Sequence, residues 1–110
     1  NVPDILVCMD EETTECARQA VLDFNLAGKV EIIGYYTSED ILAAVEKGVI
    51  SVTCDVDTTQ LGQYSVEAVT SYIEDGRTNS FYNVDINFLD KTAVEKMRRE
   101  AATDEKNPLE

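Results

Sequence analysis

The sequence contains no histidine. The common Ser-His and Cys-His catalytic arrangements are therefore excluded within this chain, and a metal site would have to consist of thiolates and carboxylates alone. The chain also lacks the GxGxxG and GxxxxGK[ST] motifs that bind nucleotide phosphates, and the GxSxG motif of many hydrolases. These absences favour a protein that binds something over an enzyme. We expect no catalytic residue, no metal site and no cofactor.

Basic residues are scarce. Lysine and arginine number 9 against 22 aspartates and glutamates, which gives a formal charge of −13. Nucleic acids and anionic membrane surfaces are bound through basic footprints, so neither is an expected partner of this segment. Hydrophobic residues make up 44% of the 110 residues. That share is enough for a packed core, and the length corresponds to one domain or a piece of one.

Cysteine occurs only at Cys8, Cys16 and Cys54, with no CxxC spacing. An odd, widely spaced set does not form a disulfide framework. Cys8 and Cys54 are interpreted as small buried apolar residues, because no basic neighbour is present to activate a thiol. No run of about 18 apolar residues occurs, so we expect no membrane-spanning helix.

Three successive segments have the pattern of a strand followed by a helix. The strands are expected at residues 4–9, 30–36 and 50–56. The helix N-caps are expected at Asp10, at Ser38, and at Asp57 or Thr58. The first strand is a continuous apolar run, which indicates a strand covered on both faces. Strand starts about 20–25 residues apart are typical of parallel βαβ crossovers, so we predict an α/β fold with an open parallel sheet and flanking helices.

The pattern changes after Gly76. Apolar and polar residues alternate from 82 to 88, which predicts a half-exposed strand. Thr92 and Glu95 match a capping box for a last helix that runs to about residue 101.

The two ends of the chain carry expectations of their own. Asn1 is not a natural start, so we expect that an upstream segment was removed. Residues 103–110 are expected to form a frayed tail. Leu109 and Glu110, after Asn107 and Pro108, resemble a cloning scar.

Ligands of open parallel sheets bind at the carboxyl ends of the strands. Asp10, Asp55 and Asp57 follow or end expected strands and could hold a divalent cation there, but Asp10 and Asp57 are better interpreted as helix caps. Tyr35 and Tyr36 also end a strand. Either one could stack on a ligand or pack over the sheet edge, and only one of the two can line the cleft, because adjacent strand residues point to opposite faces.

The stretch from Ile5 to Gly76 resembles the C-terminal part of the sugar-type periplasmic binding proteins. More distantly, it resembles the effector domains of LacI-like bacterial repressors. The resemblance depends on the order and spacing of several short pieces. These are the apolar strand running into Asp10-Glu11, the helix from Glu15 to Phe24, Ile32-Ile33-Gly34, Ser38 to Val45, Lys47 to Thr53, Gln60-Leu61-Gly62, Val66 to Val69, and Asp75-Gly76.

The resemblance implies a protein with two lobes that close on a small ligand across a hinge. Residues 1–102 would be the C-terminal part of that ligand-binding domain, comprising an incomplete second lobe and segments near the hinge. The intact protein would be the extracytoplasmic, periplasmic or lipid-anchored, component of a bacterial ABC-type importer and would meet a membrane permease. In this family the helix near residues 60–75 packs on the first lobe, so we expect the present chain to form a homodimer that covers the exposed surface.

The resemblance places the ligand at Met9, Asp10, Tyr36 and Val56. Asp10 keeps the family's residue, whereas Met9, Tyr36 and Val56 replace polar groups that bind sugar hydroxyls in the family. Leaving those hydroxyls without partners would cost about 1–3 kcal/mol each. A pentose or hexose in the usual pose is therefore not expected, and a more apolar or aromatic ligand, or no small ligand, fits these residues better.

Two other interpretations stay open. The same lobes could serve a sensor or a transcriptional regulator, which in the latter case would be cytoplasmic. The early part of the chain also resembles a phosphoacceptor receiver domain, with Asp10 and Glu11 on Mg²⁺ and Asp55 as the nucleophile. Against the receiver, no Lys-Pro pair occurs and the late strand is polar and alternating.

Overall fold

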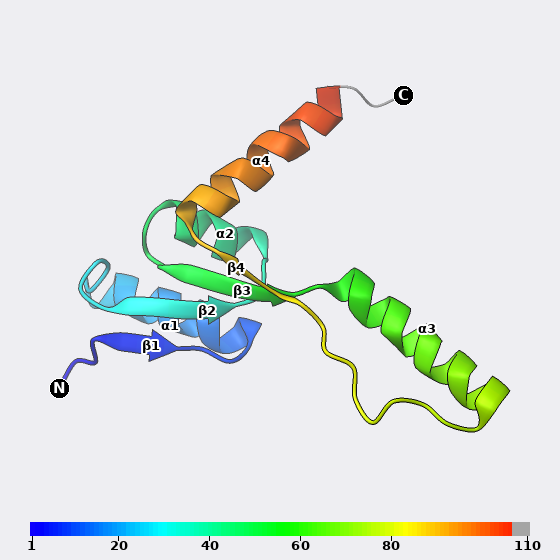
Figure 1. The fold of residues 1–110 in the computed structure, drawn as a ribbon. Coiled ribbons are helices and arrows are strands. Elements are labelled where there is room, and N and C mark those ends of the chain that lie inside the picture. The colour runs from blue at the N-terminus through cyan, green and yellow to red at the C-terminus, as the bar shows by residue number, and fades with distance from the viewer. Residues whose placement is uncertain (107–110) are drawn as a thin grey trace. The chain divides into compact units, whose positions relative to one another are not determined.

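The computed structural model describes residues 1–106 (Figure 1). Its elements, in chain order, are β1 (Ile5–Val7), α1 (Glu11–Asp23), β2 (Glu31–Tyr35), α2 (Glu39–Glu46), β3 (Val52–Val56), α3 (Thr58–Asp75), β4 (Ile86–Leu89) and α4 (Lys91–Lys106). The chain divides into two compact units. Unit 1 is formed by Asn1–Asp55 and the chain from Phe88 onward, and unit 2 is Val56–Asn87.

The sheet has the strand order β1-β2-β3-β4. β1 pairs with β2 in parallel, with Leu6 opposite Ile32, and β2 pairs with β3 in parallel, with Gly34 opposite Thr53. The predicted α/β class with an open, parallel-type sheet is confirmed.

Helices α1 and α2 cover one face of this sheet in unit 1. Each parallel strand is added on the same side of the last one, and right-handed crossovers then place both connecting helices on the same face. Accordingly, α1 packs on β2 and against α2. On the opposite face Ile5 and Val7 are 52% and 63% exposed. The prediction that β1 is covered on both faces is therefore wrong for the described chain.

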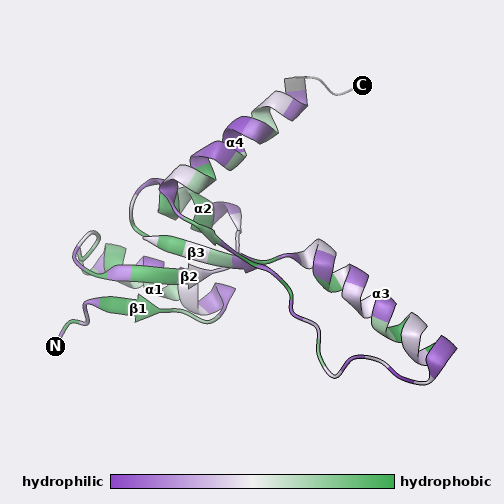
Figure 2. Ribbon diagram, viewed as in Figure 1, coloured by the Kyte–Doolittle hydropathy of each residue, from purple (hydrophilic) through white to green (hydrophobic). Residues whose placement is uncertain are grey.

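The hydrophobic core lies between the sheet and the helices of unit 1. Its members are Val21, Val30, Ile32, Ile41, Leu42, Ala44, Val45, Ile50 and Val94. They come from α1, β2 and the residue before it, α2, the segment before β3, and α4. Figure 2 shows the apolar colour concentrated on α2 and the strands. In α1, Val21 is buried and Ala17 half-buried, whereas Cys16, Ala20 and Phe24, which share the apolar spacing, are exposed.

Helix α4 begins two residues earlier than its sequence pattern predicted. The side chain of Asp90 accepts a hydrogen bond from Ala93 N at 2.9 Å, so Asp90 caps the helix and the expected capping box at Thr92 is wrong. The helix also continues to Lys106, past the predicted end near residue 101. The remaining residues of the expected tail, with the Asn107 to Glu110 ending, lie outside the described residues.

An ion-pair cluster fixes α4 to α2. The guanidinium of Arg98 on α4 donates to Glu39 and Glu46 at the two ends of α2, with an Nη2 to Oε1 distance of 2.6 Å to Glu39. Val94 lies one turn away on the same helix and is fully buried. Apolar packing and charge pairing therefore hold the same stretch of α4.

Unit 2 consists of α3 and the segment that returns from it. Asp57 caps α3 by accepting from Gln60 N at 3.0 Å, and Gly76 ends it in the left-handed conformation (φ 70°). The Gln60 side chain donates to Asp85 Oδ2 at 2.8 Å and accepts from Asp85 N at 2.9 Å. These bonds close the base of the unit.

None of the residues of α3 is buried. The apolar face expected for this helix is present in the sequence but is solvent-exposed in the structure. Its largest exposed members are Leu61 (48%), Val69 (60%), Tyr72 (64%) and Ile73 (76%). Exposed apolar stripes of this kind mark surfaces that meet a partner.

Candidate functional site

The carboxyl end of the unit 1 sheet brings together the segment after β1 and the segment after β2. β1 and β2 are parallel neighbours, so their carboxyl ends lie at the same edge. Met9 and Asp10 follow β1, and Tyr36 follows β2. Three of the four predicted ligand-binding residues are therefore at one edge of unit 1.

Asp10 is the N-cap of α1. Its Oδ1 accepts from Thr13 N and from Thr13 Oγ1, each at 2.7 Å. The backbone N–H and then the hydroxyl of Thr13 lower the pKa of the Asp10 carboxyl, so the group is ionised at neutral pH. Both of these bonds use Oδ1. Oδ2 is therefore the oxygen that remains suited to accept a hydrogen bond from a ligand.

Met9 stands next to this carboxylate and is 80% exposed. A thioether side chain with this exposure is apolar, flexible and polarisable, and it adapts to ligands of different shapes. The pair presents one charged acceptor beside one apolar surface.

Tyr36 adopts a left-handed backbone conformation, with φ of 90°. A bulky side chain rarely occupies this region, and strain of this kind costs of the order of 1–3 kcal/mol. The residue is 45% exposed. Of the two adjacent tyrosines, Tyr35 ends β2 and is half-buried, so Tyr36 is the more accessible one.

Sequence reasoning missed two threonines that organise this edge. Thr14 and Thr53 are both fully buried. Thr14 Oγ1 donates to Asp10 O at 2.7 Å and accepts from Tyr35 N at 3.0 Å, and Thr53 Oγ1 donates to Tyr36 O at 2.6 Å. A signal was available for Thr14, which lies three and seven residues before Ala17 and Val21 on the inner face of α1.

Two of the cysteines, Cys8 and Cys54, lie at the strands of unit 1. Burial is the main factor that raises the pKa of the Cys8 thiol, which keeps it protonated. Both were predicted to be buried, and both are half-buried: Cys8 packs against the core, and Cys54 Sγ donates to Gly34 O at 3.4 Å. Among residues 1–106, no group of three histidines, cysteines or carboxylates is placed to hold a metal ion.

The remaining predicted residues lie at the end of β3. Val56 is its last residue, half-buried, and unit 2 begins with it. Asp55 is half-buried, and Asp57 is committed to capping α3. The interpretation of Asp10 and Asp57 as helix caps is confirmed, and neither the cation site nor the receiver interpretation gains support.

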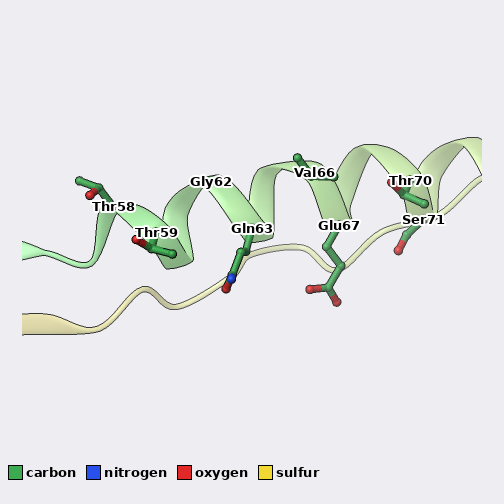
Figure 3. Close-up of a pocket in the computed structure, with 8 residues that line it drawn as sticks. All are labelled: Thr58, Thr59, Gly62, Gln63, Val66, Glu67, Thr70 and Ser71. Carbon is green, nitrogen blue, oxygen red and sulfur yellow. The ribbon is translucent and has the colours of Figure 1, made fainter. Parts of the chain in front are cut away.

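A surface pocket occurs within unit 2, on α3 (Figure 3). It is lined by Thr58, Thr59, Gly62, Gln63, Val66, Glu67, Thr70 and Ser71. A single helix supplies every lining residue, whereas a site that encloses a small ligand draws its lining from several elements. None of the four predicted ligand-binding residues takes part, and we assign this hollow no ligand role.

The fold is similar to that of several solved structures, which include solute-binding proteins. A mutant form of the XylFII-LytSN complex superposes with a TM-score of 0.71 and 27% identity, over 83% of this chain and 36% of that one. A periplasmic solute-binding protein of an ABC transporter from Actinobacillus succinogenes, with bound D-allose, superposes with a TM-score of 0.71 and 24% identity, over 84% and 32%. GanP, a glucose-galactose binding protein from Geobacillus stearothermophilus, gives 0.74 and 17%, over 81% and 32%.

No protein-family model matches the sequence, and no curated protein matches it. The chain spans about a third of the length of the solved structures it resembles. Among residues 1–106, no helix is both long enough and apolar enough to cross a membrane. The architecture is that of an α/β, partial periplasmic-binding-protein-like fold.

Proposed function

We propose that this chain is the C-terminal part of a two-lobed solute-binding protein that serves a bacterial ABC-type importer. The observation that carries the proposal is the superposition, over more than four fifths of the chain, on solute-binding proteins that include an allose complex and a glucose-galactose binding protein. The allose complex and GanP are named as binding proteins, which agrees with a non-enzymatic role. The intact protein would act outside the cytoplasm and deliver its ligand to a membrane permease.

The proposed ligand site comprises Met9, Asp10 and Tyr36 of unit 1, and the family resemblance adds Val56. The free Oδ2 of Asp10 would accept a hydrogen bond from one ligand hydroxyl. Met9 and Tyr36 are exposed, and Val56 is half-buried. Three of the four side chains lack a strong acceptor for hydroxyl groups, so the site favours a ligand with a few hydroxyls and a substantial apolar or aromatic portion.

The exposed apolar stripe of α3 supports the two-lobed organisation. None of the residues of this helix is buried, and the chain spans only a third of its structural neighbours. A further lobe in the intact protein would cover such a stripe.

Native mass spectrometry of the full-length protein, purified without added ligand, tests the proposal. A bound small molecule supports it, and its mass distinguishes a free sugar from a larger, partly apolar ligand. The matched control is the double variant Asp10→Ala with Tyr36→Ala, which should lose the adduct. An empty wild-type protein that binds neither free sugars such as D-allose nor a glycoside with an aromatic group, phenyl β-D-glucopyranoside, would contradict the solute-binding role.

A second candidate function is ligand sensing through a protein partner. Two of the similar structures are complexes of XylFII with a second protein, LytSN, at 27% and 26% identity. A sensor or regulator would use the same lobes but transmit closure to another protein, and it would be cytoplasmic in the case of a transcriptional regulator. The gene's upstream sequence separates the candidates: a signal peptide with a lipid-attachment cysteine favours import, and a helix-turn-helix favours a regulator.

A further inference from the structure

Two buried hydroxyl groups converge on one strained peptide segment. In the described chain the buried polar residues are Thr14 and Thr53, both without exposed surface. The hydroxyls of both residues bond to the backbone at Tyr35 and Tyr36. They approach from different elements, α1 and β3, which flank the end of β2.

Three backbone groups of Tyr35 and Tyr36 each take part in a hydrogen bond. Tyr35 N donates to Thr14 Oγ1 at 3.0 Å, and Tyr36 N donates to Cys54 O at 2.8 Å. Tyr36 O accepts from Thr53 Oγ1 at 2.6 Å. No buried side-chain nitrogen or oxygen of the described chain lacks a hydrogen-bond partner. A bonded network of this kind fixes one backbone conformation and excludes the alternatives.

The conformation that the network fixes is unfavourable for tyrosine. Glycine would adopt a φ of 90° without strain, as Gly28, Gly48 and Gly76 do at 81°, 79° and 70°. Packing of the ring does not offset the strain, because Tyr36 is 45% exposed and is not part of the core cluster. The folding of unit 1 therefore gives no reason for a large aromatic side chain here.

The same network reaches the other half of the proposed site. Thr14 Oγ1 donates to Asp10 O at 2.7 Å while it accepts from Tyr35 N. One buried oxygen therefore fixes the spacing between the carbonyl group of Asp10 and the Gly34–Tyr35 peptide, one residue before Tyr36. Gly34 allows Thr14 this position, since a β-carbon at Gly34 would lie 2.6 Å from Thr14 Cγ2.

We propose that Thr14 and Thr53 are positioning residues that hold Tyr36 in its left-handed conformation, so that its ring forms a fixed aromatic surface beside Asp10 on which the apolar or aromatic face of the ligand packs. This inference depends on the proposed solute-binding function and names the ligand class. The ligand combines a hydroxyl-bearing part, bonded by Asp10, with a flat apolar part, packed on the Tyr36 ring. Holding the ring in place before binding lowers the ordering cost of association.

The test uses two probes that differ only in the aromatic group, phenyl β-D-glucopyranoside and methyl β-D-glucopyranoside. Their dissociation constants are measured by calorimetry on the full-length protein and on Thr53→Val, Thr53→Ser and Tyr36→Ala. In parallel, hydrogen exchange of the Tyr36 amide reports the backbone conformation without any ligand. Crystal structures of the variants report φ at Tyr36 directly.

We expect the wild-type protein to prefer the phenyl glycoside. Thr53→Val keeps the shape but removes the hydroxyl, so the Kd for the phenyl glycoside should rise about tenfold and the Tyr36 amide should exchange about tenfold faster. Thr53→Ser keeps the hydroxyl and should restore both. Tyr36→Ala should abolish the preference between the two probes and leave the weak binding of the methyl glycoside.

Two control variants separate positioning from stability. Val45→Ala weakens the core without touching this edge, and Thr103→Val makes the same chemical change at the exposed hydroxyl that bonds Arg99 O. Neither should change the ratio of the two dissociation constants. A Val45→Ala variant that loses the ratio as Thr53→Val does would reduce the threonine to a structural role.

The remaining outcomes each overturn a distinct part of the inference. If φ at Tyr36 and the exchange of its amide are unchanged in Thr53→Val, Thr53 does not maintain the left-handed conformation of Tyr36, whether or not any probe binds. A changed conformation with an unchanged ratio of dissociation constants refutes the role of the ring in ligand selection. Equal dissociation constants of the wild-type protein for the methyl and the phenyl glycoside refute the ligand class and leave the solute-binding function intact. Failure to bind either probe removes the ligand role of Tyr36.

Discussion

The left-handed conformation of Tyr36 predicts an inverted order of stability for two substitutions at that position. Tyr36→Gly and Tyr36→Ala both remove the ring, so the loss of side-chain contacts is nearly the same in each. The variants differ in the backbone. At φ of 90° alanine retains the strain of an L-residue, whereas glycine does not.

The magnitude follows from the backbone preference alone. The left-handed region costs an L-residue roughly 1–2 kcal/mol. Glycine avoids this strain, but the greater conformational entropy of its unfolded chain offsets about 0.5–1 kcal/mol of the resulting stabilisation. We therefore expect Tyr36→Gly to be about 0.5–1 kcal/mol more stable than Tyr36→Ala.

Tyr35 provides the matched control. It precedes Tyr36 in the sequence and lies in β2 with ordinary strand geometry. There the order should be the usual one, with Tyr35→Gly roughly 0.5–1 kcal/mol less stable than Tyr35→Ala. Urea unfolding of all four variants, followed by circular dichroism of the helices, gives the comparison.

A more stable alanine variant at both positions would refute the strain at residue 36. In that case the backbone at residue 36 relaxes out of the left-handed region once the ring is removed, and no strain is present for the threonines to maintain. Equal slopes of unfolding free energy against urea across the four variants are needed for the comparison to hold.

Three further predictions concern packing, charge and association. Gly34→Ala should destabilise the protein by roughly 1–3 kcal/mol, because its β-carbon would lie 2.6 Å from Thr14 Cγ2, and Thr14→Ser, which removes that methyl group, should rescue part of the loss in a double-mutant cycle of urea unfolding. The hydrogen bond from Arg98 lowers the pKa of Glu39 below its ordinary 4.5, so this pair stabilises the fold above that pH and the contribution is lost as the pH falls through the lowered value. The stability difference between wild type and Arg98→Ala should accordingly shrink on acidification, and a difference independent of pH would contradict the assignment. Light scattering of the 110-residue chain over an about tenfold concentration range should show dimers, since the apolar stripe of α3 is exposed; a monomer throughout would refute this.

Local sequence signals predicted the strand and helix order of the fold well. Asp10 and Ser38 cap their helices as expected, and Asp57 is the cap where Asp57 or Thr58 was expected, because each is a short polar residue that follows a strand within a few positions. The cap of α4 was misplaced. Asp90 and Thr92 are both good cap residues, and the choice between them depends on where the buried Val94 must face the core, which is not a local property.

The candidate site was only partly predictable. The carboxyl edge of the sheet and the positions of Met9, Asp10 and Tyr36 follow from the strand pattern. The left-handed φ of Tyr36 does not, since tyrosine carries no preference for it. In the sequence Thr53 is indistinguishable from an ordinary strand residue. Only the pairing of β2 with β3 brings its hydroxyl to Tyr36 O.

The sequence pattern could not predict whether the apolar face of α3 is buried. Leu61, Val69 and Tyr72 share a helical face, and such a stripe predicts a buried surface. The pattern states that a partner surface is needed but not whether the same chain provides it. Unit 2 by itself does not provide it, and each of the three residues is at least 48% exposed.

Hydrogen bonds join the two ends of unit 2, so the chain enters and leaves this unit at neighbouring positions. Asp57 N donates to Asp85 O at 2.9 Å, so the chain leaves and returns at almost the same point. None of the core residues of unit 1 comes from Val56–Asn87. A deletion that joins Asp55 to Phe88 through a short turn would therefore leave that core complete, and insertion or exchange of a whole module at this point is a change that such a fold can tolerate during evolution.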